Sequence, residues 1–73
     1  KIMKILIAED DPRLLKSLMY IFKMNNFAVD GVDNGIDAYD YAATDEYDGL
    51  VLDIMLPGMD GIEILKKLKE RGN

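Results

Sequence analysis

The chain has 73 residues, and neither cysteine nor histidine is among them. Without cysteine there is no disulfide, no thiolate zinc site and no thiol nucleophile. Without histidine the chain lacks the commonest general base and the commonest transition-metal ligand. Any metal site must therefore use oxygen ligands, which suit magnesium, manganese or calcium. Absence of cysteine also fits a reducing compartment, so we expect a cytoplasmic protein.

Long apolar runs and excess positive charge are also missing. The apolar stretches reach only four or five residues, as in Ile5 to Ala8, whereas a membrane span needs roughly 20. The net charge is -5, and an acidic chain repels phosphate backbones. We therefore expect no membrane and no nucleic acid as partners of this segment. A hydrophobic content of 49% with only 2 prolines predicts one folded domain over residues 1–73, with no second domain.

Three short apolar segments have the character of β-strands. They are Lys4 to Ala8, Phe27 to Val32, and Tyr47 to Asp53. The first is continuously apolar and β-branched, which is typical of a strand buried on both faces. The second is interrupted by Asp30 and Gly31, which favours a position at the edge of a sheet.

Helical patterns follow each of these segments. Asp11 before Pro12 predicts an N-cap and the first helical position, and Asn25-Asn26 predicts the end of that helix. A second, shorter helix is expected from Asn34-Gly35 to about Thr44.

Asp60 predicts the N-cap of a third helix, which Gly72 ends. Glu63 stands three residues after Asp60, as in a capping box with Asp in place of Ser or Thr. Each helix has apolar residues at helical spacing, which we expect to face the core. These residues are Leu14, Leu15, Leu18, Met19 and Phe22 in the first helix, Ile36, Tyr39, Ala42 and Ala43 in the second, and Ile62, Leu65 and Leu68 in the third.

The resulting order is β-α-β-α-β-α, with a helix between each strand and the next. Strands connected in this way are parallel, and their crossovers are right-handed. We therefore predict an α/β protein with a doubly wound parallel sheet of three strands. Ligands of such sheets bind beyond the carboxyl ends of the strands.

Acidic residues follow two of the predicted strands. Glu9, Asp10 and Asp11 end the first strand, and Asp53 ends the third. Two full charges about 5 Å apart repel by roughly 3 kcal/mol at an effective dielectric constant of 20, so such a group needs a cation or a proton. Helix capping is sufficient to explain Asp11, whereas Glu9 and Asp10 fit a solvated acidic turn or a metal site equally well. Asp53 interrupts six apolar residues and is the strongest functional candidate.

Two segments resemble a known family. They are Lys4-Ile5-Leu6-Ile7-Ala8-Glu9-Asp10-Asp11 and Leu52-Asp53-Ile54-Met55-Leu56-Pro57-Gly58-Met59-Asp60-Gly61, with a softer match at Val32-Asp33-Asn34-Gly35. The chain resembles the receiver domain of response regulators, the phosphoacceptor module of two-component signalling. The resemblance implies a flavodoxin-like fold of which the chain covers the first three βα units, a partial receiver domain of about three fifths of the family's length.

The resemblance implies a role for each matching residue. Asp53 would be the phosphoacceptor for a sensor histidine kinase, in a module that is not itself an enzyme. Asp10 would bind Mg²⁺ or Mn²⁺ directly, Glu9 directly or through water, and Asp53 would share the ion. Met55 would contribute its backbone carbonyl, and Pro57 and Gly58 would shape the adjoining loop.

The chain also departs from the family pattern. It has no counterpart of the Thr or Ser, the Lys and the aromatic residue that follow in the family, and its lysines at 66, 67 and 69 lie on a helix that runs away from the acidic edge. We therefore expect a truncated receiver in which phosphoryl transfer is impaired. The alternative is a receiver fragment that forms a homodimer without signalling, through the exposed third strand or the uncovered sheet face. A glycosidase-type pair of carboxylates is disfavoured, because such a site needs a sugar cleft and Tyr and Phe are the only aromatic residue types in the chain.

Overall fold

The computed structural model describes residues 1–72, in which strands and helices alternate strictly. In chain order the elements are β1 (Lys4–Ala8), α1 (Pro12–Met24), β2 (Ala28–Val32), α2 (Gly35–Ala42), β3 (Gly49–Leu52) and α3 (Gly61–Glu70). The predicted α/β class and element order are confirmed; Asn73, the last residue of the predicted domain, lies outside the described residues. Among residues 1–72, no helix is long and apolar enough to cross a membrane.

The three strands form one parallel sheet in the order β2-β1-β3. The edge position predicted for β2 is confirmed, and β3 forms the other edge. Ala8 at the end of β1 is paired with Val32 of β2 and with Leu52 of β3, so all three strands end at the same edge. The chain passes from β1 to β2 on one side and then returns across β1 to β3. This reversal places a topological switch point between β1 and β3, where ligands of doubly wound sheets bind.

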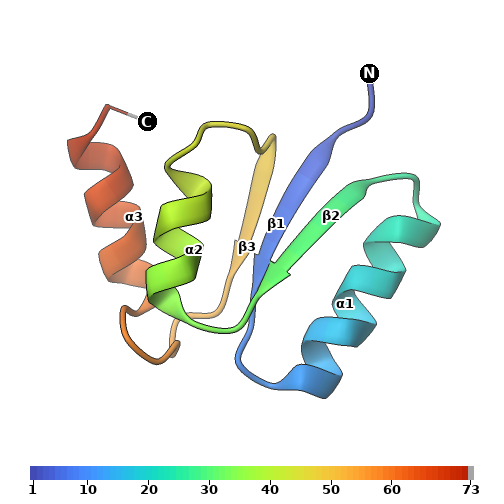
Figure 1. The fold of residues 1–73 in the computed structure, drawn as a ribbon, viewed down its shortest axis with the longest axis horizontal. Coiled ribbons are helices and arrows are strands. Elements are labelled where there is room, and N and C mark those ends of the chain that lie inside the picture. The colour runs from blue at the N-terminus through green and yellow to red at the C-terminus, as the bar shows by residue number, and fades with distance from the viewer. Residues whose placement is uncertain (73) are drawn as a thin grey trace.

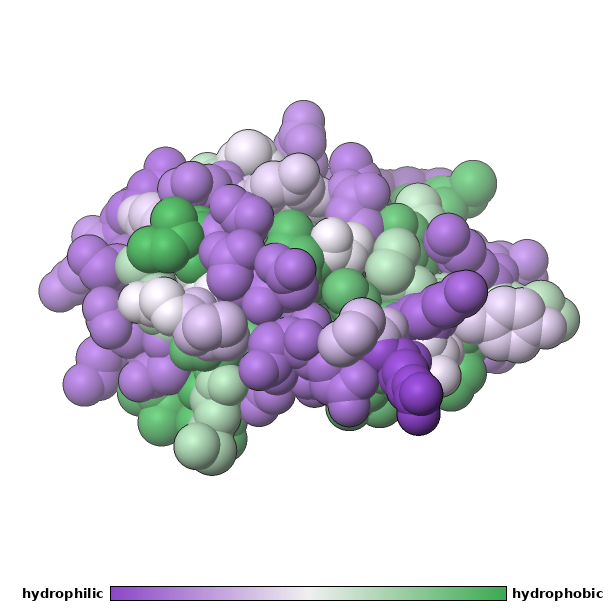
Figure 2. Space-filling view, turned by 60° about the horizontal axis from the view of Figure 1, so that its bottom comes forward, coloured by the Kyte–Doolittle hydropathy of each residue, from purple (hydrophilic) through white to green (hydrophobic). Residues whose placement is uncertain are grey.

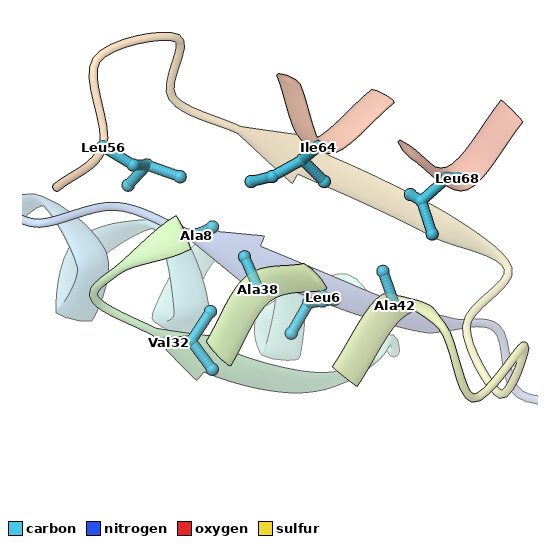
Figure 3. Close-up of a cluster of buried hydrophobic side chains, with 8 residues drawn as sticks. All are labelled: Leu6, Ala8, Val32, Ala38, Ala42, Leu56, Ile64 and Leu68. Carbon is cyan, nitrogen blue, oxygen red and sulfur yellow. The ribbon is translucent and has the colours of Figure 1, made fainter. Parts of the chain in front are cut away.

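The helices lie on both faces of the sheet, with α1 on one face and α2 and α3 on the other (Figure 1). The main core lies between the sheet and the α2–α3 pair, where side chains from all these elements point toward one another (Figure 3). Its buried members are Leu6, Ala8, Val32, Ala38, Ala42, Leu56, Ile64 and Leu68.

The opposite face of the sheet is covered only by α1. Side chains alternate along a strand, so Ile5 and Ile7 of β1 point away from the main core, and both are buried. In the described α1, however, no residue is fully buried, and Leu14, Ile21 and Met24 are exposed. This layer therefore buries its helix less completely than the α2–α3 layer does.

The predicted helix ends are largely confirmed. Asp11, Asn34 and Asp60 each accept a hydrogen bond from a backbone N–H group of the first turn that follows. Asn26 and Gly72 have positive φ angles of 68° and 88° just beyond α1 and α3, as expected for residues that end helices.

The predicted core faces of all three helices are partly wrong. In α1, Leu14 is exposed. Ile36 is 50% exposed, and the smaller Ala38 is buried in its place. Ile62 and Leu65 are 53% and 54% exposed, whereas Ile64 is fully buried. Both α2 and α3 carry apolar residues on more than one face, so helical spacing alone does not distinguish the face that packs. In α2 the small side chain of Ala38 lets the helix lie close to the sheet.

Two predicted boundaries also differ. The third strand is only Gly49–Leu52, shorter than the predicted segment Tyr47 to Asp53, and α2 ends at Ala42, before Thr44. Leu50 was expected to be buried but is 36% exposed, because β3 has a neighbouring strand on one side only.

Candidate metal centre at the strand ends

The acidic residues lie where β1 and β3 end. Glu9 and Asp10 follow β1, and Asp53 follows β3. Hydrogen bonds continue the sheet one step past the strands, because the Asp53 N–H donates to the Ala8 carbonyl at 3.0 Å and the Glu9 N–H donates to the Val32 carbonyl at 3.0 Å. The parallel pairing therefore fixes the backbones of Glu9 and Asp53 on adjacent strands at the switch point.

The side chains of these residues come together as well. Glu9, Asp10 and Asp53 each offer a carboxylate oxygen, and the three oxygens all lie within 4.8 Å of one another. Glu9 is 9% exposed, Asp53 is half-buried and Asp10 is exposed to solvent. The structure thus brings together the three carboxylates that the sequence proposed as metal ligands. We call this group the acidic cluster.

Backbone N–H groups orient two of the three carboxylates. The Asp11 N–H donates to Glu9 Oε2 at 2.9 Å, and the Met55 N–H donates to Asp53 Oδ1 at 3.0 Å. The bond from Asp11 lowers the pKa of Glu9, but burial and the carboxylates of Asp10 and Asp53 outweigh it and raise that pKa above its ordinary value. A raised pKa in a carboxylate group of this kind indicates negative charge that is poorly compensated by the protein alone.

The acidic cluster fits a hard divalent cation. Two unit charges 4.8 Å apart repel by about 3 kcal/mol at an effective dielectric constant of 20. Magnesium prefers oxygen ligands, uses one or two carboxylates and keeps several waters. Asp10 is exposed, so an ion held there would keep contact with water, while Glu9 and Asp53 are the more buried members of the cluster.

The loop after β3 forms one wall of the site. Met55 is 81% exposed, and its backbone N–H contacts the acidic cluster through the hydrogen bond to Asp53 Oδ1. Met55, Pro57 and Asp10 help to line a shallow hollow of about 520 Å³ beside the cluster. Figure 2 views the molecule from the strand-end side and shows hydrophilic residues across the middle, with hydrophobic residues beside them.

The lysines of α3 do not complete the site. This helix starts beside the strand ends and runs back along the sheet (Figure 1). Lys67 and Lys69 lie in its last turn, at the end remote from the acidic cluster. The same orientation places the helix N-terminus, with its cap Asp60, near the site.

One contact that shapes the site, between Gly35 and the loop after β3, was not predicted from the sequence. Gly35 was expected only to open α2, but it is buried against the loop after β3, and its N–H donates to the Pro57 carbonyl at 2.9 Å. Leu56, in the same loop, is buried in the main core. The only signal for this contact in the sequence was the glycine directly after the N-cap Asn34. That signal does not show which segment the glycine contacts.

The fold and the acidic cluster define a doubly wound α/β module with three clustered carboxylates at the switch point. The sequence matches the family described as response regulator receiver domain over residues 5–73. The chain belongs to this family.

Individual proteins with similar sequences include response regulators. The chain is 37% identical over 71 residues to the response regulator MprA of Mycobacterium avium (strain 104), covering 97% of this chain and 31% of that protein. It is 43% identical over 70 residues to protein RcaC of Microchaete diplosiphon, covering 96% of this chain and 11% of that protein. The chain therefore spans less than a third of the length of these curated relatives.

Solved structures show the same fold. The receiver domain of the Francisella response regulator 1452 superposes with a TM-score of 0.91 at 31% identity, over 96% of this chain and 58% of that one. A structure described as FixJ-N superposes with a TM-score of 0.80 at 32% identity, over 99% of this chain and 58% of that one. The flavodoxin-like arrangement of strands and helices predicted from the sequence is confirmed.

Proposed function

We propose that the chain is a phosphoacceptor module of two-component signalling in which Asp53 receives a phosphoryl group from a sensor histidine kinase. The observation that supports this most strongly is the acidic cluster, whose three carboxylate oxygens lie within 4.8 Å of one another at the switch point. Membership of the receiver family supports the same reaction class.

Each residue of the site has a part in this reaction. A carboxylate oxygen of Asp53 attacks the phosphorus of phosphohistidine, the P–N bond breaks, and its electron pair stays with the imidazole nitrogen, which takes up a proton. Glu9, Asp10, Asp53 and the backbone carbonyl of Met55 would hold Mg²⁺ or Mn²⁺. The bound ion would neutralise charge on the reacting oxygens. The Met55 N–H, bonded to Asp53 Oδ1 at 3.0 Å, restricts the rotation of the nucleophile.

Transfer to this chain by itself should be slow. Positive groups and hydrogen-bond donors directed at phosphoryl oxygens are worth several kcal/mol of transition-state stabilisation. The basic residues in the last turn of α3, Lys67 and Lys69, lie away from the acidic cluster and cannot supply this contribution.

A direct test is incubation with a small acyl phosphate and Mg²⁺, followed by intact-protein and peptide mass spectrometry. We expect the mass of one phosphoryl group, labile to hydroxylamine and mapped to Asp53. Asp53→Asn should abolish the modification, and Asp40→Asn, which removes an exposed carboxylate of α2, should retain it. Phosphate on another residue, or equal labelling of Asp53→Asn, would contradict the proposal.

Exposed apolar surface favours self-association as a second candidate. Leu50 on the free edge of β3 is 36% exposed, and Leu14 and Ile21 of α1 are 46% and 55% exposed. We propose that a second copy of the chain pairs along β3 or packs on the α1 face. Sedimentation velocity with and without Mg²⁺ tests this: a concentration-dependent dimer that Leu50→Lys or Ile21→Lys disrupts supports it, and a monomer throughout the micromolar range excludes it.

A further inference from the structure

The loop that carries Asp53 and Met55 is docked on the first turn of α2. Gly35, which opens α2, is buried, and its N–H donates to the Pro57 carbonyl at 2.9 Å. A Cβ at position 35 would collide with the Met59 carbonyl oxygen and would lie 2.5 Å from the Met59 carbonyl carbon and 2.7 Å from its backbone nitrogen. These are backbone atoms, so they cannot give way as the end of a flexible side chain can.

The same contact extends along the helix and the loop. Ile36 lies over Gly58, because a Cβ at position 58 would come 3.1 Å from its side chain. Gly58 has a φ of 88°, so the loop turns in a backbone conformation that favours glycine. This explains why Ile36 is half exposed and not in the main core: it packs on the loop. The first turn of α2 therefore contacts the loop through both backbone and side chain.

The rest of the loop is held at the acidic cluster. The Asp53 N–H donates to the Ala8 carbonyl at 3.0 Å, and the Gly61 N–H donates to the Ile54 carbonyl at 3.0 Å. Residues 53–60 are thus held at both ends by β1 and α3, and near Pro57 by α2. A shift of the loop at Pro57 is taken up on its two sides, between Pro57 and Gly61 and between Asp53 and Pro57, and the second of these segments includes Met55.

We infer that Gly35 is a positioning residue for the cation site: the first turn of α2 sets the place of the 53–60 loop and thereby the affinity of the acidic cluster for a divalent cation. The cation part of this inference rests on the proposed function. The loop displacement expected on substitution does not, because it is measured in the metal-free chain.

The chain offers a matched control in Gly31. A Cβ there would lie 2.5 Å from the Met19 sulfur and 3.0 Å from Leu15 Cδ1, which are ends of flexible side chains. Gly31 belongs to β2 and meets α1, on the sheet face opposite to α2. Gly31→Ala therefore crowds a half-buried contact without touching the loop. The Gly35→Ala and Gly31→Ala variants separate a general packing defect from loop positioning.

The experiment compares the two variants with the unmodified chain by two-dimensional NMR, first without metal and then during titration with MgCl₂. We expect Gly35→Ala to shift the amide resonances of residues 53–60 and to weaken Mg²⁺ binding by about 10–100-fold, the usual effect of removing a group that orients metal ligands. Gly31→Ala should shift resonances around α1 and leave Mg²⁺ affinity unchanged. A folded Gly35→Ala chain with unshifted loop resonances and unchanged affinity overturns the inference.

Hydrogen exchange in the unmodified chain tests the coupling even if Gly35→Ala does not fold. Coupling between two sites is reciprocal, so a loop contact that strengthens cation binding is itself strengthened by the cation. Saturating Mg²⁺ should therefore slow exchange of the Gly35 amide, which is not a ligand. Unchanged exchange at Gly35 while Asp53 and Met55 resonances shift would overturn the inference. If Mg²⁺ shifts no resonance, the proposed function fails. The positioning role of the first turn of α2 is then tested without metal: shifted resonances of residues 53–60 in Gly35→Ala or Ile36→Ala support it, and unshifted ones overturn it.

Discussion

Replacing Asp53 by asparagine should stabilise the chain when no divalent cation is present. The substitution removes one charge from a cluster in which the carboxylate oxygens lie within 4.8 Å of one another. The Met55 N–H that donates to Asp53 Oδ1 keeps an acceptor, because the asparagine side chain has a carbonyl oxygen in the same place. The substitution therefore relieves repulsion at little cost in hydrogen bonding.

The magnitude follows from the geometry and the exposure. Asp53 repels Glu9 and Asp10 by about 3 kcal/mol each at an effective dielectric constant of 20. Asp10 is exposed and Asp53 is half-buried, so water and salt screen much of this repulsion. We therefore expect Asp53→Asn to raise the free energy of unfolding by about 1 kcal/mol. This is the upper end of the interaction energies found for pairs of exposed charges.

Urea denaturation at low ionic strength in the presence of a chelator measures this difference. Asp40→Asn makes the same change in net charge outside the acidic cluster and is the control. Mg²⁺ at 100 times its dissociation constant should stabilise the unmodified chain by about 2.7 kcal/mol and stabilise Asp53→Asn much less, so the order of stabilities reverses. An Asp53→Asn chain no more stable than Asp40→Asn without metal would show that repulsion within the acidic cluster does not destabilise the fold.

Two further predictions concern the opposite end of the sheet. The Tyr47 hydroxyl donates to Asp30 Oδ2 at 2.6 Å, and burial and this carboxylate raise the pKa of Tyr47 above its ordinary value. Tyr47→Phe should lower the free energy of unfolding at neutral pH by about 1 kcal/mol. This difference should be lost as pH rises through the folded-state pKa of Tyr47. Equal urea midpoints for the two chains at neutral pH would contradict the prediction. The Lys4 N–H and the Lys1 ammonium both donate hydrogen bonds to the Asp48 carboxylate. They hold the pKa of Asp48 below its ordinary value of 3.8. Its contribution to stability should be present above 3.8 and lost as pH falls through the folded-state pKa; an NMR titration midpoint at or above 3.8 would argue against this.

Much of the fold could be predicted from the sequence because local signals agree with the global arrangement. Asp11 and Asp60 cap the helices they were expected to cap, and the apolar run Lys4–Ala8 is the central strand. Alternation of strands and helices was sufficient to predict a parallel sheet whose strand ends share one edge. The strand order β2-β1-β3, which places Asp10 and Asp53 at neighbouring strand ends, did not follow from this alternation.

The errors arose where a pattern allowed two solutions. The third helix has apolar residues at 62, 64, 65 and 68, and contact with the sheet and α2 selects Ile64 and not Ile62 or Leu65. The contact of Gly35 with Met59 joins segments more than twenty residues apart, and nothing local indicates it. Tertiary packing determines which helix face is buried and which loop a glycine contacts, so the spacing of residues in the sequence does not predict them.

Whether Asp10 and Asp53 hold one common cation can be measured by the stoichiometry and ligand dependence of Mn²⁺ binding, followed by loss of the free-ion electron paramagnetic resonance signal. We expect one ion to bind per chain, with affinity reduced at least tenfold in Asp10→Asn and in Asp53→Asn, since each removes a charged oxygen ligand. Asp40→Asn should bind as the unmodified chain does. Undiminished binding to either Asp10→Asn or Asp53→Asn would show that these two carboxylates do not hold a common cation.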